Sequence, residues 1–210
     1  TGYAGTSTVV QIPAGVTAIA AHAFDGSSIQ AVVIPASVKT IGESAFANTA
    51  SLASVTFADA AQSELTSIGA SAFEGSAVAG IELPMGVTEL GARVFASSSL
   101  ATAYIPGSVA AIPASAFEGS KLVTLMLGEG VQSMGASALA SCENLTAVKT
   151  GTGLADASAV EGLPSSMRSL GESAFAGCSA LKALTLNEGL ASIGGAAFAH
   201  VNIDALTVPN

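Results

Sequence analysis

The two cysteines, Cys142 and Cys178, are the residues of this 210-residue chain whose chemistry depends most on where the fold places them. Two cysteines whose Cα atoms lie within about 7 Å can form a disulfide, whereas buried free thiols pack as small apolar side chains. No basic residue lies within five positions of Cys142 or within three of Cys178, so nothing local favours a thiolate. The sequence leaves a disulfide and a pair of buried free thiols open, and it disfavours a reactive cysteine.

The other ionisable residues do not form a pattern typical of an active site. His22 and His200 stand near opposite ends of the chain, so no histidine pair is expected to share a proton. Asp25, Glu74 and Glu118 each follow a phenylalanine, but in alternate repeats, which places them about 10 Å apart, too far to share one cation. We expect these carboxylates to be solvated, and we expect no enzyme activity, no metal site and no cofactor.

Composition excludes several further classes of protein. The net charge is −9 with six Lys and Arg, which cannot form a surface that neutralises nucleic-acid phosphates. No stretch approaches the ~20 consecutive apolar residues of a membrane span, so we expect no membrane insertion of this segment. Half of the residues are hydrophobic and 10% are charged, a balance that argues against disorder.

A repeat of about 22 residues organises the chain. Its anchor is an apolar residue, usually the Phe of an Ala-Phe pair, and the anchors are Phe24, Phe46, Phe73, Phe95, Phe117, Leu139, Phe175 and Phe198. Every anchor has an Ile, Leu or Met five residues before it and a Val, Leu or Met eight residues before it. A unit this short cannot close a core alone, so the sequence predicts eight units stacked into one solenoid with a continuous core.

Each unit contains the same succession of local patterns. A block such as Leu181-x-x-Leu184-x-Leu186 alternates in its last positions, which indicates a strand with one buried face. A Val-x-x-Ile-Gly segment, as at Val38–Gly42, predicts a second, short extended piece. The small Ala-rich segment around the anchor predicts a single helical or 3₁₀ turn that leads back to the next strand.

Residues 7–210 resemble the BspA-like class of leucine-rich repeats, which is found in bacterial surface proteins. The resemblance rests on the repeated Val-x-x-Ile-Gly-x-x-Ala-Phe pattern, and Ile41–Phe46 and Gly177–Leu181 are especially close to it. It implies a leucine-rich-repeat solenoid, a right-handed superhelix of about 22–23-residue units with parallel β-strands and short helical turns. It also implies a secreted or wall-anchored protein of the bacterial cell surface, extracellular, that acts in adhesion or binds host proteins. It supplies no binding residues to transfer.

The strand position between the two inward residues should point outward and form a sheet face that binds a protein partner. Tyr104 and Met126 are adjacent, large and partly or wholly apolar, so we expect them to form an exposed strip on this face. Isolated exposed apolar residues are also ordinary on proteins that bind nothing there. The candidate binding residues are Val33, Thr56, Glu82, Tyr104, Met126 and Lys149.

Two insertions interrupt the regular spacing, one near residues 58–64 and one near residues 151–166. Both come just after a predicted strand, so they should lie on the same edge of the solenoid. Such loops often carry binding residues, but loop length also drifts at low cost, about 0.6 kcal/mol per doubling.

The sequence thus predicts one solenoid domain over residues 1–210, with eight units and a truncated ninth, as a piece of a longer surface protein. Its predicted function is non-enzymatic recognition or adhesion, as a monomer, with a protein partner such as a host extracellular-matrix or plasma protein. The alternative is a passive spacer that presents other domains. Cys142 and Cys178 occupy the same position of adjacent units, three residues after the anchor, so they should be neighbours.

Overall fold

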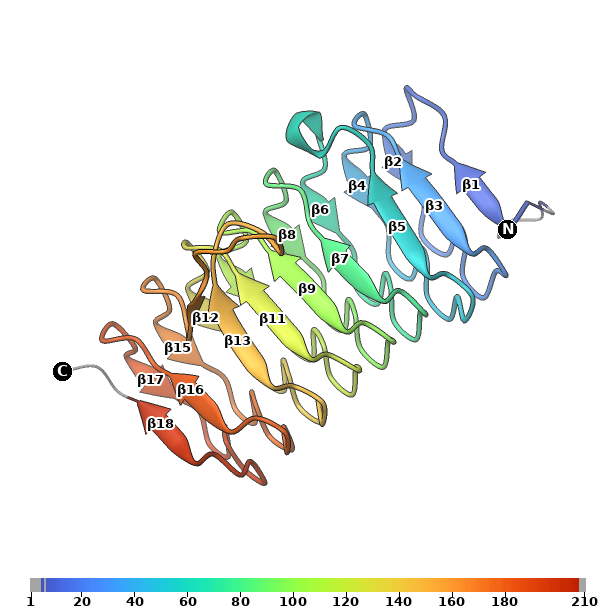
Figure 1. Cartoon of the computed structure of the whole chain (residues 1–210). Coiled ribbons are helices and arrows are strands. Elements are labelled where there is room, and N and C mark those ends of the chain that lie inside the picture. Colours follow the sequence, from blue (N-terminus) through green and yellow to red (C-terminus); the bar gives the residue numbers. More distant parts are fainter. Residues whose placement is uncertain (1–4, 6, 208–210) are drawn as a thin grey trace.

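The computed structural model describes residue 5 and residues 7–207, and within them the chain forms a parallel β-solenoid (Figure 1). The final residues of the predicted ninth unit, 208–210, lie outside the described residues. Successive coils stack along one axis, with one long and one short strand in each full coil. The predicted solenoid of parallel strands is confirmed.

The long strands form one face of the solenoid, and neighbouring long strands pair in parallel except across the β5–β7 and β13–β16 junctions. They are β1 (Val9–Gln11), β3 (Ala31–Ile34), β5 (Ser54–Phe57), β7 (Gly80–Glu82), β9 (Thr102–Ile105), β11 (Thr124–Leu127), β13 (Ala147–Thr150), β16 (Ala183–Thr185) and β18 (Ala205–Thr207). One further strand, β14 (Val160–Glu161), pairs antiparallel with β13.

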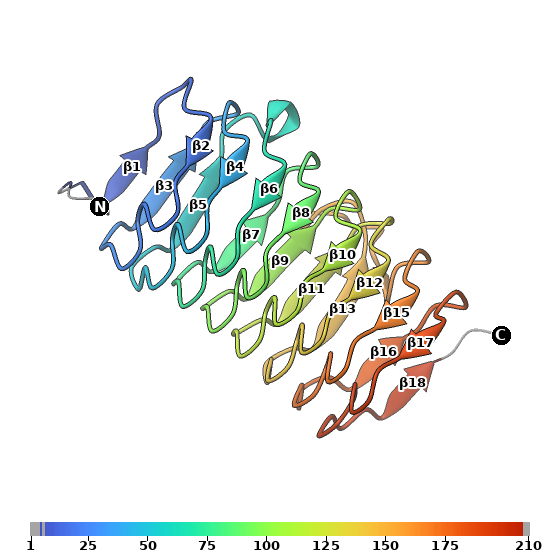
Figure 2. The same cartoon turned by 180° about the vertical axis from the view of Figure 1, so that it is seen from behind.

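The Val-x-x-Ile-Gly segments form the opposite face, seen from behind in Figure 2. Each of their strands is two residues long, and its second residue is the Ile, Leu or Met of the repeat. They are β2 (Ala18–Ile19), β4 (Thr40–Ile41), β6 (Ser67–Ile68), β8 (Glu89–Leu90), β10 (Ala111–Ile112), β12 (Ser133–Met134), β15 (Ser169–Leu170) and β17 (Ser192–Ile193).

The predicted helical turn around each anchor is wrong. The one helical segment among the described residues is a single 3₁₀ turn, η1 (Ala60–Gln62), in the first insertion. The anchor segments are instead turns whose N–H groups bond to the next coil, as Phe46 N donates to Ala72 O at 2.8 Å. Residues two before the anchor, such as Ser44 at φ 51°, take the left-handed conformation that a helix excludes.

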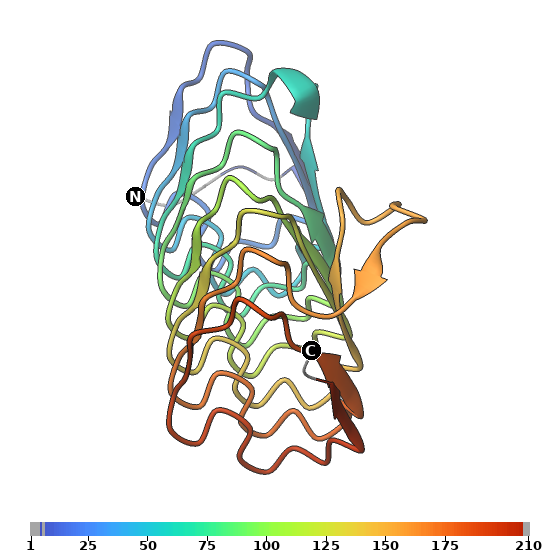
Figure 3. The same ribbon diagram turned by 90° about the vertical axis from the view of Figure 1, so that its left-hand side faces the viewer.

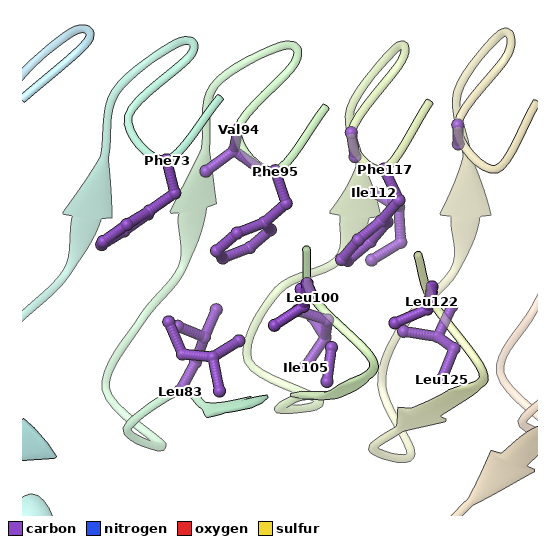
Figure 4. Packing of buried hydrophobic residues seen from close by; sticks show 14 of the residues in the cluster. Phe73, Leu83, Val94, Phe95, Leu100, Ile105, Ile112, Phe117, Leu122 and Leu125 are labelled. Atoms are coloured by element: carbon purple, nitrogen blue, oxygen red, sulfur yellow. The ribbon is translucent and has the colours of Figure 1, made fainter. Parts of the chain in front are cut away.

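The anchor side chains fill the core as a stack of rings. Neighbouring rings from Phe24 to Phe117 lie 5.1–5.5 Å apart and nearly parallel, and Phe175 and Phe198 lie 5.4 Å apart. Leu139, the one anchor that is not phenylalanine, separates the two stacks and is fully buried. Figure 4 shows Phe73, Phe95 and Phe117 packed above leucines and isoleucines that lie in or beside the long strands, such as Leu83, Ile105 and Leu125. The core is therefore continuous along the solenoid, as the repeat predicts.

The sheets are interrupted where the sequence departs from the repeat. The long-strand ladder stops between β5 and β7 and between β13 and β16, which are the places of the two insertions. The short-strand ladder stops between β8 and β10, where Pro113 stands in the glycine position. In six other units this glycine donates its N–H to the preceding coil, as Gly91 N does to Ile68 O at 2.7 Å. Proline has no N–H to donate, so the ladder is interrupted at this coil.

Candidate protein-binding face

The strand register places the predicted outward residues side by side on the long-strand face. Val33 is paired with Thr56, and in the central sheet Glu82, Tyr104, Met126 and Lys149 occupy one register row. Thr56 and Glu82 are exposed, whereas Val33 and Lys149 are half-buried. The predicted alignment of these residues is confirmed.

The predicted exposure of the Tyr104–Met126 strip is wrong. Tyr104 is 2% exposed and Met126 is 4% exposed. The second insertion runs back from β13 across their side chains, so that Gly151 lies against Met126 Sδ and Gly153 lies against the carboxylate of Glu82. Figure 3 shows this insertion, in orange, standing out from the long-strand face. We call residues 151–160 the covering loop.

The base of the covering loop is fixed to the sheet. β14 pairs with β13, and the Lys149 ammonium lies 2.9 Å from the Glu161 carboxylate. The hydroxyl of Thr150 donates to Gly162 O at 3.0 Å. Lys149, predicted as a binding residue, therefore anchors the loop in this structure.

The tip of the covering loop is held by its own hydrogen bonds. The Asp156 carboxylate accepts from the N–H and hydroxyl of Thr152 and from the N–H and hydroxyl of Ser158, at 2.6–3.0 Å. These bonds hold the pKa of Asp156 well below its usual range. Over the described chain, the backbone hydrogen bonds of residues 152–159 stay within the loop. The tip thus rests on Tyr104 and Met126 by packing alone.

A groove of about 450 Å³ opens beside the covering loop on the same face. Its floor includes Thr56, Glu82 and Tyr104, and its two ends are Ala60 of the first insertion and Thr152 of the second. The predicted placement of both insertions on one edge is confirmed, because each follows the carboxyl end of a long strand. The structure adds that the two insertions face each other across one groove.

Met85 is a groove residue that the sequence analysis missed. Its side chain is 62% exposed and lies on the groove beside Tyr104, whose hydroxyl donates to Met85 Sδ at 3.5 Å. The residue after the strand-ending proline is Ala14, Ala36 or Gly107 in other units, so a large apolar residue at this position was a usable signal.

The carboxylates that follow the anchors are paired more than the sequence predicts. Arg93 lies in the unit between Glu74 and Glu118, and its guanidinium is 2.6 Å from a Glu74 oxygen and 3.5 Å from a Glu118 oxygen. The hydrogen bond from Arg93 lowers the pKa of Glu74. Asp25 accepts from Asn48 Nδ2 of the next coil at 3.1 Å. The contacts of Arg93 and of Asn48 link adjacent coils.

Cys142 and Cys178 are buried free thiols in this structure. The Cys142 thiol donates to Phe117 O at 3.0 Å, and the Cys178 thiol donates to Leu139 O at 3.2 Å. Thr49 and Ser98 occupy the same repeat position, but each donates to the carbonyl of the anchor in its own coil, at 2.7 Å. Burial raises the pKa of Cys142 to about 11 and that of Cys178 to about 12. The cysteines therefore continue a ladder of small polar residues inside the solenoid.

Neither thiol is expected to react with a water-soluble disulfide reagent at pH 8 in the folded protein. The raised pKa values leave almost no thiolate at that pH, and the side chains are inaccessible. Thiol titration with this reagent in guanidinium should detect two thiols per chain. The same titration without denaturant should detect close to none. A purified chain 2 Da lighter than the reduced mass would contradict free thiols by revealing a disulfide.

Met126 should resist oxidation by hydrogen peroxide while Met85 is oxidised readily. The two methionines lie on the same face, but the covering loop leaves Met126 4% exposed and Met85 62% exposed. Peptide mass spectrometry over a peroxide time course measures both in one sample. Asp156→Ala, which removes the bonds that hold the loop tip, should speed oxidation of Met126 and leave Met85 unchanged. Equal rates for the two methionines in the parent chain would contradict the observed cover.

Among the described residues, no group of three or more His, Cys, Asp and Glu is placed to hold a metal ion. The same part of the chain contains no helix long and apolar enough to cross a membrane.

Comparison with known proteins assigns the fold to a family. The family described as "BspA type Leucine rich repeat region" matches in six copies, over residues 3–63, 60–159 and 160–210. No curated protein matches the sequence significantly. Among solved structures, a leucine-rich repeat protein of T. pallidum is similar with a TM-score of 0.70 and 29% identity, over 85% of this chain and 80% of that one.

A leucine-rich repeat protein of Eubacterium ventriosum is similar at a TM-score of 0.56 and 18% identity, over 95% of this chain. This chain spans 56% of the length of that structure, and at this identity the likeness concerns the fold alone. The family match, in contrast, extends over nearly every residue of the solenoid. The chain belongs to the BspA-type leucine-rich repeat family.

Proposed function

We propose that this protein is a non-enzymatic recognition module that binds a protein partner on its long-strand face, at the groove between the two insertions. One observation carries the proposal: the two long insertions into the regular coil, in β5–β6 and β13–β15, face each other across one groove. Insertions in repeat proteins map to loops on one face, which is often the binding face.

Family membership supports two finer parts of the proposal. Leucine-rich repeats are protein-interaction modules, so a protein partner is the expected class of ligand. We also propose that the protein acts outside the cell, on a bacterial surface, with a host extracellular-matrix or plasma protein as its partner. The alternative function is a passive spacer. The coils stack evenly on either side of the groove, and such stacking suits a spacer as well as a binding module.

Biolayer interferometry of the whole chain against extracellular-matrix and plasma proteins at physiological salt tests the proposal. The variant is Thr56→Arg, which places a long cationic side chain at an exposed floor position of the groove. Tyr104 and Met126 are unsuitable because their loss would unseat the covering loop. The matched control is Thr40→Arg, an equally exposed strand threonine on the opposite face.

A recognition module should lose at least about tenfold in affinity with Thr56→Arg, equivalent to about 1.4 kcal/mol, and keep its affinity with Thr40→Arg. Binding that both variants retain would move the site away from the groove. A panel without any binding partner would favour the spacer.

A further inference from the structure

The groove carries one charged side chain, and that side chain has no ionic partner. Glu82 is the only ionisable acid or base among the described groove residues apart from the Tyr104 phenol. It is exposed, and none of the ion pairs in the described chain includes it. Lys149, the cation in the same register row as Glu82, is already engaged by Glu161. The chain itself therefore offers nothing to neutralise Glu82.

Negative charge also converges on the floor of the groove at Tyr104. Burial first, and then the carboxylates of Glu82 and Asp156, raise the pKa of the Tyr104 phenol. The phenol donates its proton to a thioether, a weak acceptor, at 3.5 Å. Its oxygen keeps lone pairs that can accept a hydrogen bond from a cationic N–H group.

Most of the remaining groove residues are apolar and suit an aliphatic stem. Val55, Leu83 and Pro84 line it, and Met85 projects along it with 62% of its surface exposed. Lysine and arginine combine such a stem with a charged head that stays near water or a carboxylate. The net charge of −9 adds a long-range attraction for a basic partner.

We propose that the groove binds an extended segment of a basic protein partner, with one lysine or arginine side chain lying along Met85 and pairing with Glu82. This inference rests on the proposed recognition function and specifies the chemistry of its partner. The Tyr104 oxygen accepts a second hydrogen bond from the cation, and Thr152 of the covering loop bounds the segment at one end.

Titration of the ¹⁵N-labelled whole chain with three short peptides tests this inference, because amide shifts report the location of even weak binding. The peptides share a Gly/Ser/Ala frame and carry arginine, norleucine or glutamate at the central position. Norleucine provides an aliphatic stem without the charge. The variant is Glu82→Gln, which keeps the shape of the side chain, and the control is Glu89→Gln, another exposed strand carboxylate on the opposite face.

The arginine peptide should shift the amides of Thr56, Glu82, Met85 and Thr152 and bind more tightly than the norleucine peptide. Glu82→Gln should lower the affinity for the arginine peptide about threefold to tenfold, the range expected for a partly screened charge pair. Glu89→Gln should leave that affinity unchanged. Raising the salt concentration from 0.05 M to 0.3 M should lower the affinity for the arginine peptide and not the affinity for the other two peptides.

Equal affinity for the arginine and norleucine peptides would overturn the inference, as would shifts confined to amides outside the groove or no shifts at millimolar peptide. This failure is distinguishable from failure of the proposed function. A protein partner lost by Thr56→Arg but retained by Glu82→Gln would keep the recognition module and remove the basic segment. A panel without any groove-dependent partner would remove both.

Discussion

Replacement of Phe95 by alanine is expected to lower the free energy of unfolding by about 3–5 kcal/mol. The side chain is fully buried, and its ring lies 5.5 Å from that of Phe73 and 5.4 Å from that of Phe117. Truncation removes both stacking contacts and leaves a cavity in the middle of a continuous core, where neither adjacent coil can collapse without losing its strand pairing. Guanidinium denaturation followed by circular dichroism measures the loss.

The matched variant is Phe95→Leu, because the protein already places leucine at one anchor. Leu139 occupies the equivalent position, is fully buried, and stands between two coils that remain stacked through the turns. Phe95→Leu should therefore cost about 1 kcal/mol, well below the alanine variant. If the two variants were equally destabilised, the loss would come from the stacking contacts of the ring, which both variants remove, and the cavity argument would be wrong.

The repeat allowed the core and the strand register to be predicted from the sequence. In a solenoid each residue packs on its equivalent in the next coil, so one aligned position fixes all others. Once Ile29-x-x-Val32-x-Ile34 and Leu52-x-x-Val55-x-Phe57 were recognised as the same block, the pairing of Val32 with Val55 followed, and the structure has that register. The outward row of Thr56, Glu82 and Tyr104 was obtained in the same way.

The same periodicity could not predict what the insertions do. Residues 151–160 have no equivalent in any other coil, so no repeat position says which way the loop turns. It turns back over β11 and β9 because β14 pairs with β13 and because Asp156 closes the tip on Thr152 and Ser158. The prediction that Tyr104 and Met126 are exposed failed for this reason, since it considered only the strands.

The turn around the anchor was mispredicted because alanine favours helix when local preference is considered alone. Each anchor N–H instead bonds to a carbonyl of the next coil, as Phe73 N does to Val94 O at 2.8 Å. Stacking therefore satisfies the backbone between coils and removes the need for helical bonds within one coil. Serine before Ala-Phe, as at Ser44 and Ser115, was the available signal, because these residues have φ values of 51° and 55°.

Replacement of Gly69 by alanine is expected to destabilise the protein by about 1–3 kcal/mol, although it adds one methyl group. A Cβ atom on Gly69 would lie 2.6 Å from Glu43 N and 2.8 Å from Gly42 C, both backbone atoms of the preceding coil. Relief requires the two coils to separate, which weakens the bond from Gly69 N to Ile41 O, now 2.8 Å long. Denaturation midpoints and hydrogen exchange at the residue 69 amide measure the two consequences.

Gly195→Ala is the control, because a Cβ atom at that glycine meets nothing within 4 Å. It should be neutral or slightly stabilising, by about 0.4–1 kcal/mol, since alanine restricts the unfolded chain. At Pro113, which occupies the same repeat position as Gly69, loss of the N–H bond already goes with a break in the short-strand ladder, between β8 and β10. Gly69→Ala should weaken the pairing of β4 with β6, so that backbone amides exchange faster at that junction and not elsewhere. Unchanged stability and exchange in Gly69→Ala would mean that the coils can separate freely, and that the repeated glycine does not set their spacing.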